Sequence, residues 1–329
     1  MLKVKILHLP IKFLTPAKQQ FFNMKTLHFV ITLYALVSTD AVKASIPSSL
    51  MCQKKTDTLS YIQKKNLCYG IGFGGTALVH AGLYQLWYKG YPADKFHFFN
   101  DNQEWLQIDK LGHSFSSYYL GLTGIEAAKW TGVPENKRWK WAIFGSIFQD
   151  PIEIWDGFSK AWGASAGDLA ANTFGTVLSA GQEALWHEQK IKMKFSYYPS
   201  DFAAIRPNTL GSNMPERILK DYNAQTYWLT YAPFTINRFK GLGLAFGYGA
   251  NGMVGGEDNI WTDATGKVFN RSDIKRYRQY YLALDYDLTK IPSKNPHIKT
   301  LLFVLNCIKL PSPALEFSQN KLKGHWLKF

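Results

Sequence analysis

Pairs of polar side chains inside otherwise apolar, helix-forming sequence constrain the fold of this chain more than any other feature. They lie between residues 109 and 172 and are separated by three or four positions, namely Asp109 with His113, Glu153 with Asp156, and Asp168 with Asn172. Such spacing places both members of a pair on one face of a helix. Because buried ionisable groups are stable only when they are paired or ligated, we expect the three faces to meet in one polar pocket.

Three helices are expected to carry these pairs, over Asp109–Lys129, Trp139–Trp155 and Asp168–Glu188. Each range is mostly apolar, and the breaks between them contain glycine or proline. Pro151 lies two residues before Glu153 and is expected to kink or break the second helix. The predicted fold of this part is a helical bundle over residues 67–190.

The stretch Leu67–Tyr88 contains no Asp, Glu, Lys or Arg. Its length is that of a helix able to span a bilayer, and aromatic residues lie near its ends. Its five glycines and His80 are equally typical of a helix buried within protein. The sequence therefore leaves open whether the bundle is embedded in a membrane.

The N-terminal region has the pattern of an exported protein. Residues 24–44 have a basic start, an apolar run and Val-Lys-Ala before a cleavage point, which is typical of a signal peptide. Residues 1–23 then precede the true start, and residues 45–66 form a linker. Cys52 follows Ser-Leu-Met, a poor lipidation signal because the residue before the cysteine is normally small. We expect export to the periplasm or outer membrane of a Gram-negative bacterium.

The pattern changes to mixed β and α structure in residues 191–329. Alternation of large and small or polar residues predicts strands over Gly241–Gly249 and Tyr280–Leu288. Helical spacing returns over Ile298–Ile308, and Tyr197–Tyr222 is expected to be a long loop. The predicted fold class is a mainly α-helical bundle followed by a smaller, aromatic-rich β/α region.

The amino-acid composition indicates which classes of binding partner to expect. The formal net charge is +14, but the basic residues are scattered and no nucleic-acid-binding motif is present. A membrane or another anionic envelope component is therefore the expected partner, and nucleic acid is not. The three cysteines, Cys52, Cys68 and Cys307, allow one disulfide and indicate neither a disulfide framework nor a zinc site.

Two roles are open for the polar pairs. Carboxylates and imidazole suit a divalent metal or acid–base catalysis, which makes the six paired residues candidate catalytic groups and Asp109, His113 and Glu153 the candidate metal ligands. The other role is structural: hydrogen bonds and ion pairs would lock the helices together, with Lys110 as a counter-ion.

Residues 163–167 match the G-x-S-x-G pattern of hydrolase nucleophiles. That motif requires a strand before the serine and a helix after it, whereas a helical segment precedes this one. Ser165 with Asp168 is instead typical of a helix N-cap followed by an acidic first turn. We expect capping, and no nucleophile.

Three motifs in order carry a family resemblance: DKLGH at 109–113, E-x-x-DG at 153–157 and GD-x-x-AN at 167–172. With these the chain resembles the YfiM-like family of predicted periplasmic lipoproteins, and its longer Bacteroidetes members extend the likeness to DYNAQTYWL at 221–229 and KLPSPALEF at 309–317. The order of the polar residues is more loosely similar to VanZ-like membrane proteins. The resemblance implies an envelope location and no established activity.

These features lead to three functional hypotheses. The first is a structural or scaffolding component of the envelope, seated at a membrane. The second is a metal- or acid–base-dependent enzyme acting on a lipid-linked or cell-wall substrate, in which Asp168 and Asn172 orient the reacting groups. The third is a lipid- or small-ligand-binding module that uses the aromatic loop at residues 90–107.

Overall fold

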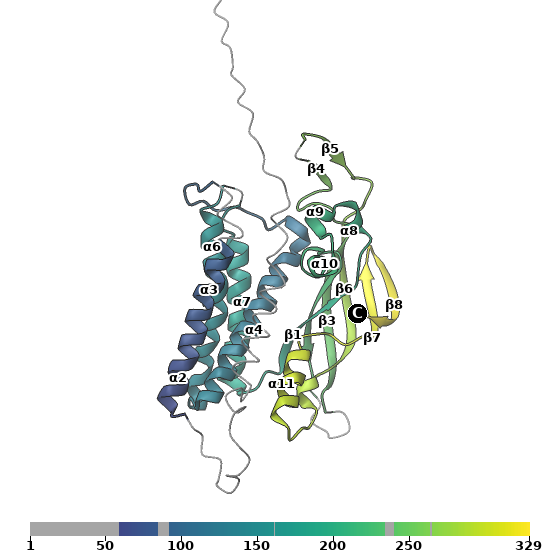
Figure 1. Cartoon of the computed structure of the whole chain (residues 1–329). Helices are drawn as coiled ribbons and strands as arrows, with labels where there is room; N and C mark the ends of the chain where they lie inside the picture. The colour runs from purple at the N-terminus through teal and green to yellow at the C-terminus, as the bar shows by residue number, and fades with distance from the viewer. Residues whose placement is uncertain (1–58, 85–91, 161, 234–239, 264) are drawn as a thin grey trace, which may run out of the picture.

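The structure, a computed structural model, describes residues 59–84, 92–160, 162–233, 240–263 and 265–329 (Figure 1). The expected signal peptide, the alternative start and Cys52 lie outside the described residues. The molecule has a helical part and a sheet part that lie side by side, with α4 between the other long helices and the sheet (Figure 1).

The helical part consists of four long segments. They are α2–η2–α3 (Tyr61–Tyr69, Gly70–Gly74, Gly75–Leu83), α4 (Ile108–Thr131), α6 (Phe144–Gly157) and α7 (Ala166–Trp186). Short turns η4 (Glu104–Gln107), α5 (Glu135–Arg138) and η5 (Trp139–Ile143) connect them. The three helices expected to carry the polar pairs are therefore confirmed. The first segment begins at Tyr61, earlier than expected, and residues 85–88 lie outside the described part.

Two findings on the helices bear on the sequence expectations. The helix α6 continues through Pro151, so of the expected kink or break the break does not occur. No helix in the described part of the chain is both long and apolar enough to cross a membrane.

The sheet part is larger than expected. Six antiparallel strands lie in the order β1-β2-β3-β6-β7-β8, over Ile191–Tyr197, Gln225–Tyr231, Leu242–Asn251, Tyr277–Tyr286, Ser312–Ser318 and Lys321–Lys328. A small hairpin pairs β4 (Ile260–Thr262) with β5 (Val268–Asn270). The helix α11 (Pro296–Leu305) and the turn η6 (Leu288–Lys290) lie at one end of the sheet.

The region between β1 and β2 was expected to be a long loop, and this is wrong. It forms three short helices, α8 (Phe202–Ile205), α9 (Pro207–Leu210) and α10 (Met214–Lys220). Proline begins α9 and lies in the first turn of α10, where its missing N–H leaves no helical hydrogen bond unmade. The prolines that suggested a loop therefore mark helix starts.

The two faces of the sheet differ in polarity in an unusual way. One face is buried and carries ion pairs, including Lys194 Nζ with Asp285 Oδ2 at 2.8 Å and Lys192 Nζ with Asp287 Oδ2 at 2.5 Å. The other face is apolar. The helix α4 covers it near Tyr227, where Ile108 and Met253 complete a buried cluster, but its leucines and phenylalanines on β3, β6 and β7 are exposed.

Glycines allow α4 and α7 to approach each other closely. A Cβ at Gly175 of α7 would lie 2.1 Å from the carbonyl oxygen of Ser114 on α4. A Cβ at Gly145 of α6 would likewise lie 2.4 Å from the carbonyl oxygen of Ser117. The backbones of the three helices thus touch where the polar pairs lie, which positions those pairs relative to one another.

We predict that Gly175→Ala lowers the free energy of unfolding by about 1–3 kcal/mol, because the added methyl group forces the two backbones apart. The matched variant is Gly181→Ala on the same helix, where a Cβ meets no atom within 4 Å. It should stabilise the protein by up to about 1 kcal/mol through helix propensity. Thermal or chemical unfolding of both variants tests this, and equal effects of the two substitutions would contradict the close approach.

Candidate functional site

The polar pairs meet where α4, α6 and α7 pack together. Asp109 and His113 come from the first turns of α4, Glu153 from α6, and Asp168 and Asn172 from the start of α7. Glu153 and Asn172 are buried, with 2% and 0% exposure, whereas about a fifth to a quarter of the side chains of His113 and Asp109 (21% and 25%) is exposed. The cluster therefore has a buried floor and one side open to solvent.

Lys110 lies between three aspartates of this cluster. Its Nζ is 2.6 Å from Asp101 Oδ2, 2.8 Å from Asp168 Oδ1 and 3.5 Å from Asp109 Oδ2. Burial alone would lower the pKa of Lys110, but the surrounding carboxylates outweigh this and hold the pKa above its ordinary value. The expected counter-ion role of Lys110 thus agrees with the geometry.

Asn172 connects the three helices through hydrogen bonds. Its Oδ1 lies 3.1 Å from His113 Nδ1 and accepts a hydrogen bond from Ser117 Oγ at 3.2 Å, and its Nδ2 donates to Asp150 Oδ1 at 3.2 Å. When Nδ1 of His113 donates to Asn172, its Nε2 carries the lone pair and lies 3.9 Å from Asp168 Oδ1. Asn172 therefore selects the tautomer of His113 that can bind a cation or a proton through Nε2.

The pKa values of two buried carboxyls of the cluster are displaced toward neutral pH. The pKa of Glu153 is raised to about 8, mainly because the carboxyl is buried. The charges of Asp168 and Asp156 raise this pKa further, whereas His113 lowers it. Burial also raises the pKa of Asp168 to about 6. Glu153 is thus a neutral acid at pH 7, and its Oε2 accepts a hydrogen bond from the backbone N–H of Ser165 at 3.3 Å.

For His113 itself, burial alone would lower the pKa, but the neighbouring carboxylates, above all Asp109 and Asp168, raise it. Groups that titrate near neutral pH and lie together in a cluster are typical of acid–base and metal sites, although ion-pair networks produce them as well.

Three ligand atoms lie close enough to share one cation. Asp109, His113 and Asp168 each offer one atom, and these atoms all lie within 4.8 Å of one another. The sequence predicted Asp109, His113 and Glu153 as the candidate ligands, whereas the atoms that converge in the structure are those of Asp109, His113 and Asp168. Glu153 Oε1 lies 3.8 Å from His113 Nδ1, beside the set.

Several members of the cluster were missed by sequence reasoning. Tyr222 donates from its hydroxyl to Asp109 Oδ1 at 2.9 Å, and Ser165 Oγ donates to Asp101 Oδ1 at 2.6 Å. Asp150 precedes Glu153 by three residues, so helical spacing could have identified it. Asp101 and Tyr222 lie in segments with no helical periodicity, and nothing local marks them.

The G-x-S-x-G segment caps a helix, as expected. Ser165 Oγ accepts a hydrogen bond from the backbone N–H of Asp168 at 3.0 Å, at the N-terminus of α7. Two other histidines contact backbone carbonyl oxygens. The ring nitrogens of His80 lie 2.8 Å from Thr76 O and 2.9 Å from Phe148 O, and His97 Nε2 lies 2.6 Å from Trp162 O. Cys68 and Cys307 are free thiols.

Comparison with protein families gives one match. Residues 97–183 match the model of a family described as Predicted periplasmic lipoprotein (DUF2279). This segment covers the whole polar cluster except Tyr222, and the match supports an exported, periplasmic location for a protein of unknown activity. Comparisons with curated proteins and with solved structures gave no match.

The pKa of Glu153 predicts a pH-dependent stability. Between about pH 4.5 and 8, Glu153 is ionised in the unfolded chain but protonated in the folded protein. The free energy of unfolding that Glu153 contributes at low pH therefore decreases over this range and is lost as the pH rises through 8. Glu153→Gln has no such proton. With a chelator present, the stability of this variant relative to wild type should therefore increase from pH 5 to pH 8, by up to about 4 kcal/mol.

Chemical denaturation at the two pH values measures this difference. Glu257→Gln removes a carboxyl at an exposed position and controls for the change in net charge. A Glu153→Gln difference that is equal at both pH values would show that the buried carboxyl titrates normally.

Proposed function

We propose that this chain is an exported envelope protein whose helical part binds one divalent cation between Asp109, His113 and Asp168 and acts as a metal-dependent enzyme. The observation that carries the proposal is the convergence of these three ligand atoms within 4.8 Å, from two helices, on the open side of a buried cluster. Two carboxylates and one imidazole are a ligand set that divalent first-row metals accept.

The charge of the cluster favours a cation. Asp101, Asp109 and Asp168 carry three carboxylates, and Lys110 is the ammonium group among them, at 2.6–3.5 Å. His113 must be neutral to ligate a metal, and three carboxylates with one ammonium group then leave a net charge of about −2, which one divalent ion would neutralise. Lys110 keeps Asp101 and Asp168 in place, so the ligand carboxylates are oriented before an ion arrives.

The chain's own residues supply the remaining functions of such a site. A cation held by three protein ligands keeps a position for water and lowers the pKa of that water. Glu153, neutral at pH 7 and 3.8 Å from the ring of His113, is placed to donate a proton. Asn172 orients His113 through its 3.1 Å contact with Nδ1. A lipid-linked or cell-wall substrate fits the periplasmic location.

A second candidate role is a structural lock, which was the first hypothesis from the sequence. The observation that favours it is Lys110, whose ion pairs to Asp101 and Asp168 at 2.6 and 2.8 Å compensate these carboxylates with no ion present. Removing one partner from a buried network leaves an uncompensated charge and costs about 3–5 kcal/mol.

Metal content distinguishes the two roles. We expect the full chain, purified without chelator, to contain about one equivalent of a divalent metal, and His113→Ala to bind it more than about 100-fold more weakly, since even outer residues of a metal site contribute 10- to 100-fold. The matched variant is His297→Ala, an exposed histidine far along the chain on α11. Elemental analysis and titration with Zn²⁺ or Mn²⁺ provide the readout, with circular dichroism to verify folding.

The structural lock makes the opposite prediction. Wild type and His113→Ala would both lack metal, and Asp168→Asn would lower the midpoint of thermal unfolding whether or not metal is added. Metal bound equally by wild type and a folded His113→Ala variant would also refute the proposed site.

A further inference from the structure

A second site lies at the other end of α4. A pocket of about 940 Å³ is formed by the last turns of α4, the turn η6 with the loop that follows it, α11, and Lys240 just before β3. Asp109 and Lys129 are twenty residues apart on α4, which places this pocket roughly 30 Å from the polar cluster. It is therefore independent of the proposed cation site.

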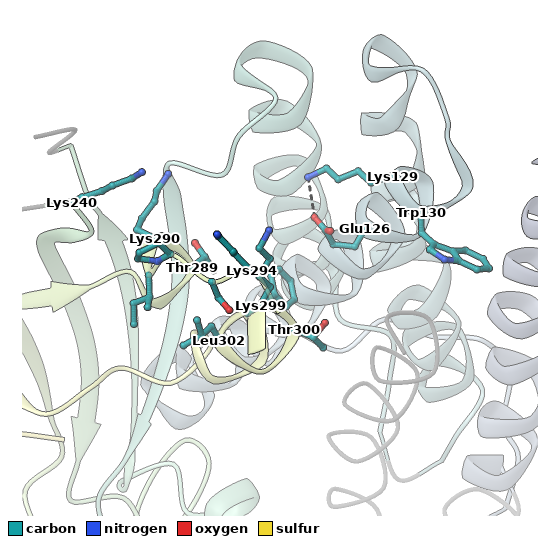
Figure 2. Close-up of a pocket in the computed structure, with 14 residues that line it drawn as sticks. Glu126, Lys129, Trp130, Lys240, Thr289, Lys290, Lys294, Lys299, Thr300 and Leu302 are labelled. Carbon is teal, nitrogen blue, oxygen red and sulfur yellow. Dashed lines mark hydrogen bonds and ion pairs between the residues drawn. The ribbon is translucent and has the colours of Figure 1, made fainter. Parts of the chain in front are cut away.

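Lysines dominate the lining of this pocket. Five line it, Lys129, Lys240, Lys290, Lys294 and Lys299, against a single acidic residue, Glu126. Figure 2 shows Lys129 extending from α4 towards the side on which Lys240 and Lys290 lie, with Lys299 between them. Because these lysines come from α4, η6, α11 and two connecting segments, their gathering is a product of the tertiary structure.

Two of the five lysines form ion pairs with described residues and three do not. Lys129 Nζ lies 2.9 Å from Glu126 Oε1, and Lys290 pairs with Glu188. Lys240, Lys294 and Lys299 are exposed and form no ion pair with any residue that the structure describes. Like charges around one pocket repel each other, so an anionic occupant would be stabilised there.

The remaining lining is largely apolar. Ile291, Pro292, Leu302 and Phe303 line the pocket beneath the lysines, and Trp130 lies at its α4 side. A small inorganic anion would gain nothing from these side chains. An amphiphile, with phosphate next to hydrocarbon, would use both kinds of lining.

The apolar face of the sheet continues from this pocket. Lys240 precedes β3 by two residues, and Lys290 follows the end of β6 by four. Close to these ends, Leu244 of β3 lies opposite Leu284 of β6, with 45% and 46% of their surfaces exposed, and Phe246 follows at 59%. Exposed apolar surface thus begins where the lysines end.

We propose that the lysine pocket binds the phosphate headgroup of an anionic phospholipid, while the exposed face of β3 and β6 contacts its acyl chains. The charge of the pocket selects the anion, and the adjoining leucines and phenylalanine select a lipid over a soluble phosphate compound. This site would seat the chain on an anionic membrane surface, in agreement with the net charge of +14.

Binding of the full chain to vesicles tests the proposal. Phosphatidylcholine vesicles with and without phosphatidylglycerol separate recognition of the anionic headgroup from apolar adsorption. In Lys240→Gln/Lys294→Gln/Lys299→Gln, the preference for anionic vesicles should fall about 100-fold, because each lysine near an anionic surface contributes about a factor of five. None of the three residues forms an ion pair with a residue that the structure describes, so the fold should be retained.

A matched variant controls for net charge. Lys95→Gln/Lys160→Gln/Lys275→Gln removes the same charge at exposed positions outside the pocket. It should reduce the preference by no more than about threefold, since charges beyond about 10 Å are screened at about 0.1 M salt. The arginine variant Lys240→Arg/Lys294→Arg/Lys299→Arg should retain binding.

Two results would overturn the proposal. Equal losses of the preference for anionic vesicles in the pocket variant and in the control variant would show that the preference depends on net charge alone. Binding of inorganic pyrophosphate that depends on the three lysines, with no preference for anionic vesicles, would assign the pocket to a soluble phosphate compound. Neither result bears on the metal content of the chain, so this site and the proposed cation site can fail separately.

Discussion

Burial of charge where α4, α6 and α7 meet is the constraint on which the helical part depends. The charged side chains of Lys110 and Asp168 lie almost out of water, and an ion removed from water costs several kcal/mol unless partners replace its hydration. Those partners come from different helices, so the helices must pack in one arrangement. Glycines such as Gly175 make this possible because they let the backbones touch. The same arrangement brings Asp109, His113 and Asp168 together. The helix packing that pairs the buried charges therefore also assembles the candidate site.

The sheet also buries charges in pairs, and its exposed face is apolar. Its buried face holds charges in pairs, such as Lys194 with Asp285, while its apolar face is covered where α4 packs on it and exposed on β3, β6 and β7. The uncovered part of that face leaves leucines and phenylalanines in contact with solvent, beside a pocket lined by lysines. Exposed apolar surface next to concentrated positive charge is an amphipathic combination suited to a lipid surface, which is why we place the membrane contact here and not on a spanning helix.

Periodicity made much of the fold predictable. The helices that carry the polar pairs follow from their apolar spacing, and β3 and β6 follow from alternation. The failures have physical reasons. Alternation shows that a strand has two unlike faces but not which face is buried, and β1 and β7 alternate lysine, serine or glutamate with apolar residues in a way that was not recognised as strand. Proline between β1 and β2 is a signal that loops and helix starts share, and here it starts short helices.

For the site, the sequence by itself determined which side chains share a helix face, because spacing along a helix is local geometry. It therefore identified Asp109 with His113 and Asp168 with Asn172 without any knowledge of the fold. Only the tertiary structure decided which faces meet at ligand distance, that Asp168 and not Glu153 joins the set, and that Asp101 and Tyr222 complete it. It likewise decided that lysines from separate helices and connecting segments line one pocket. These contacts join residues far apart in the chain, and no local pattern encodes the rotation and depth at which two packed elements meet.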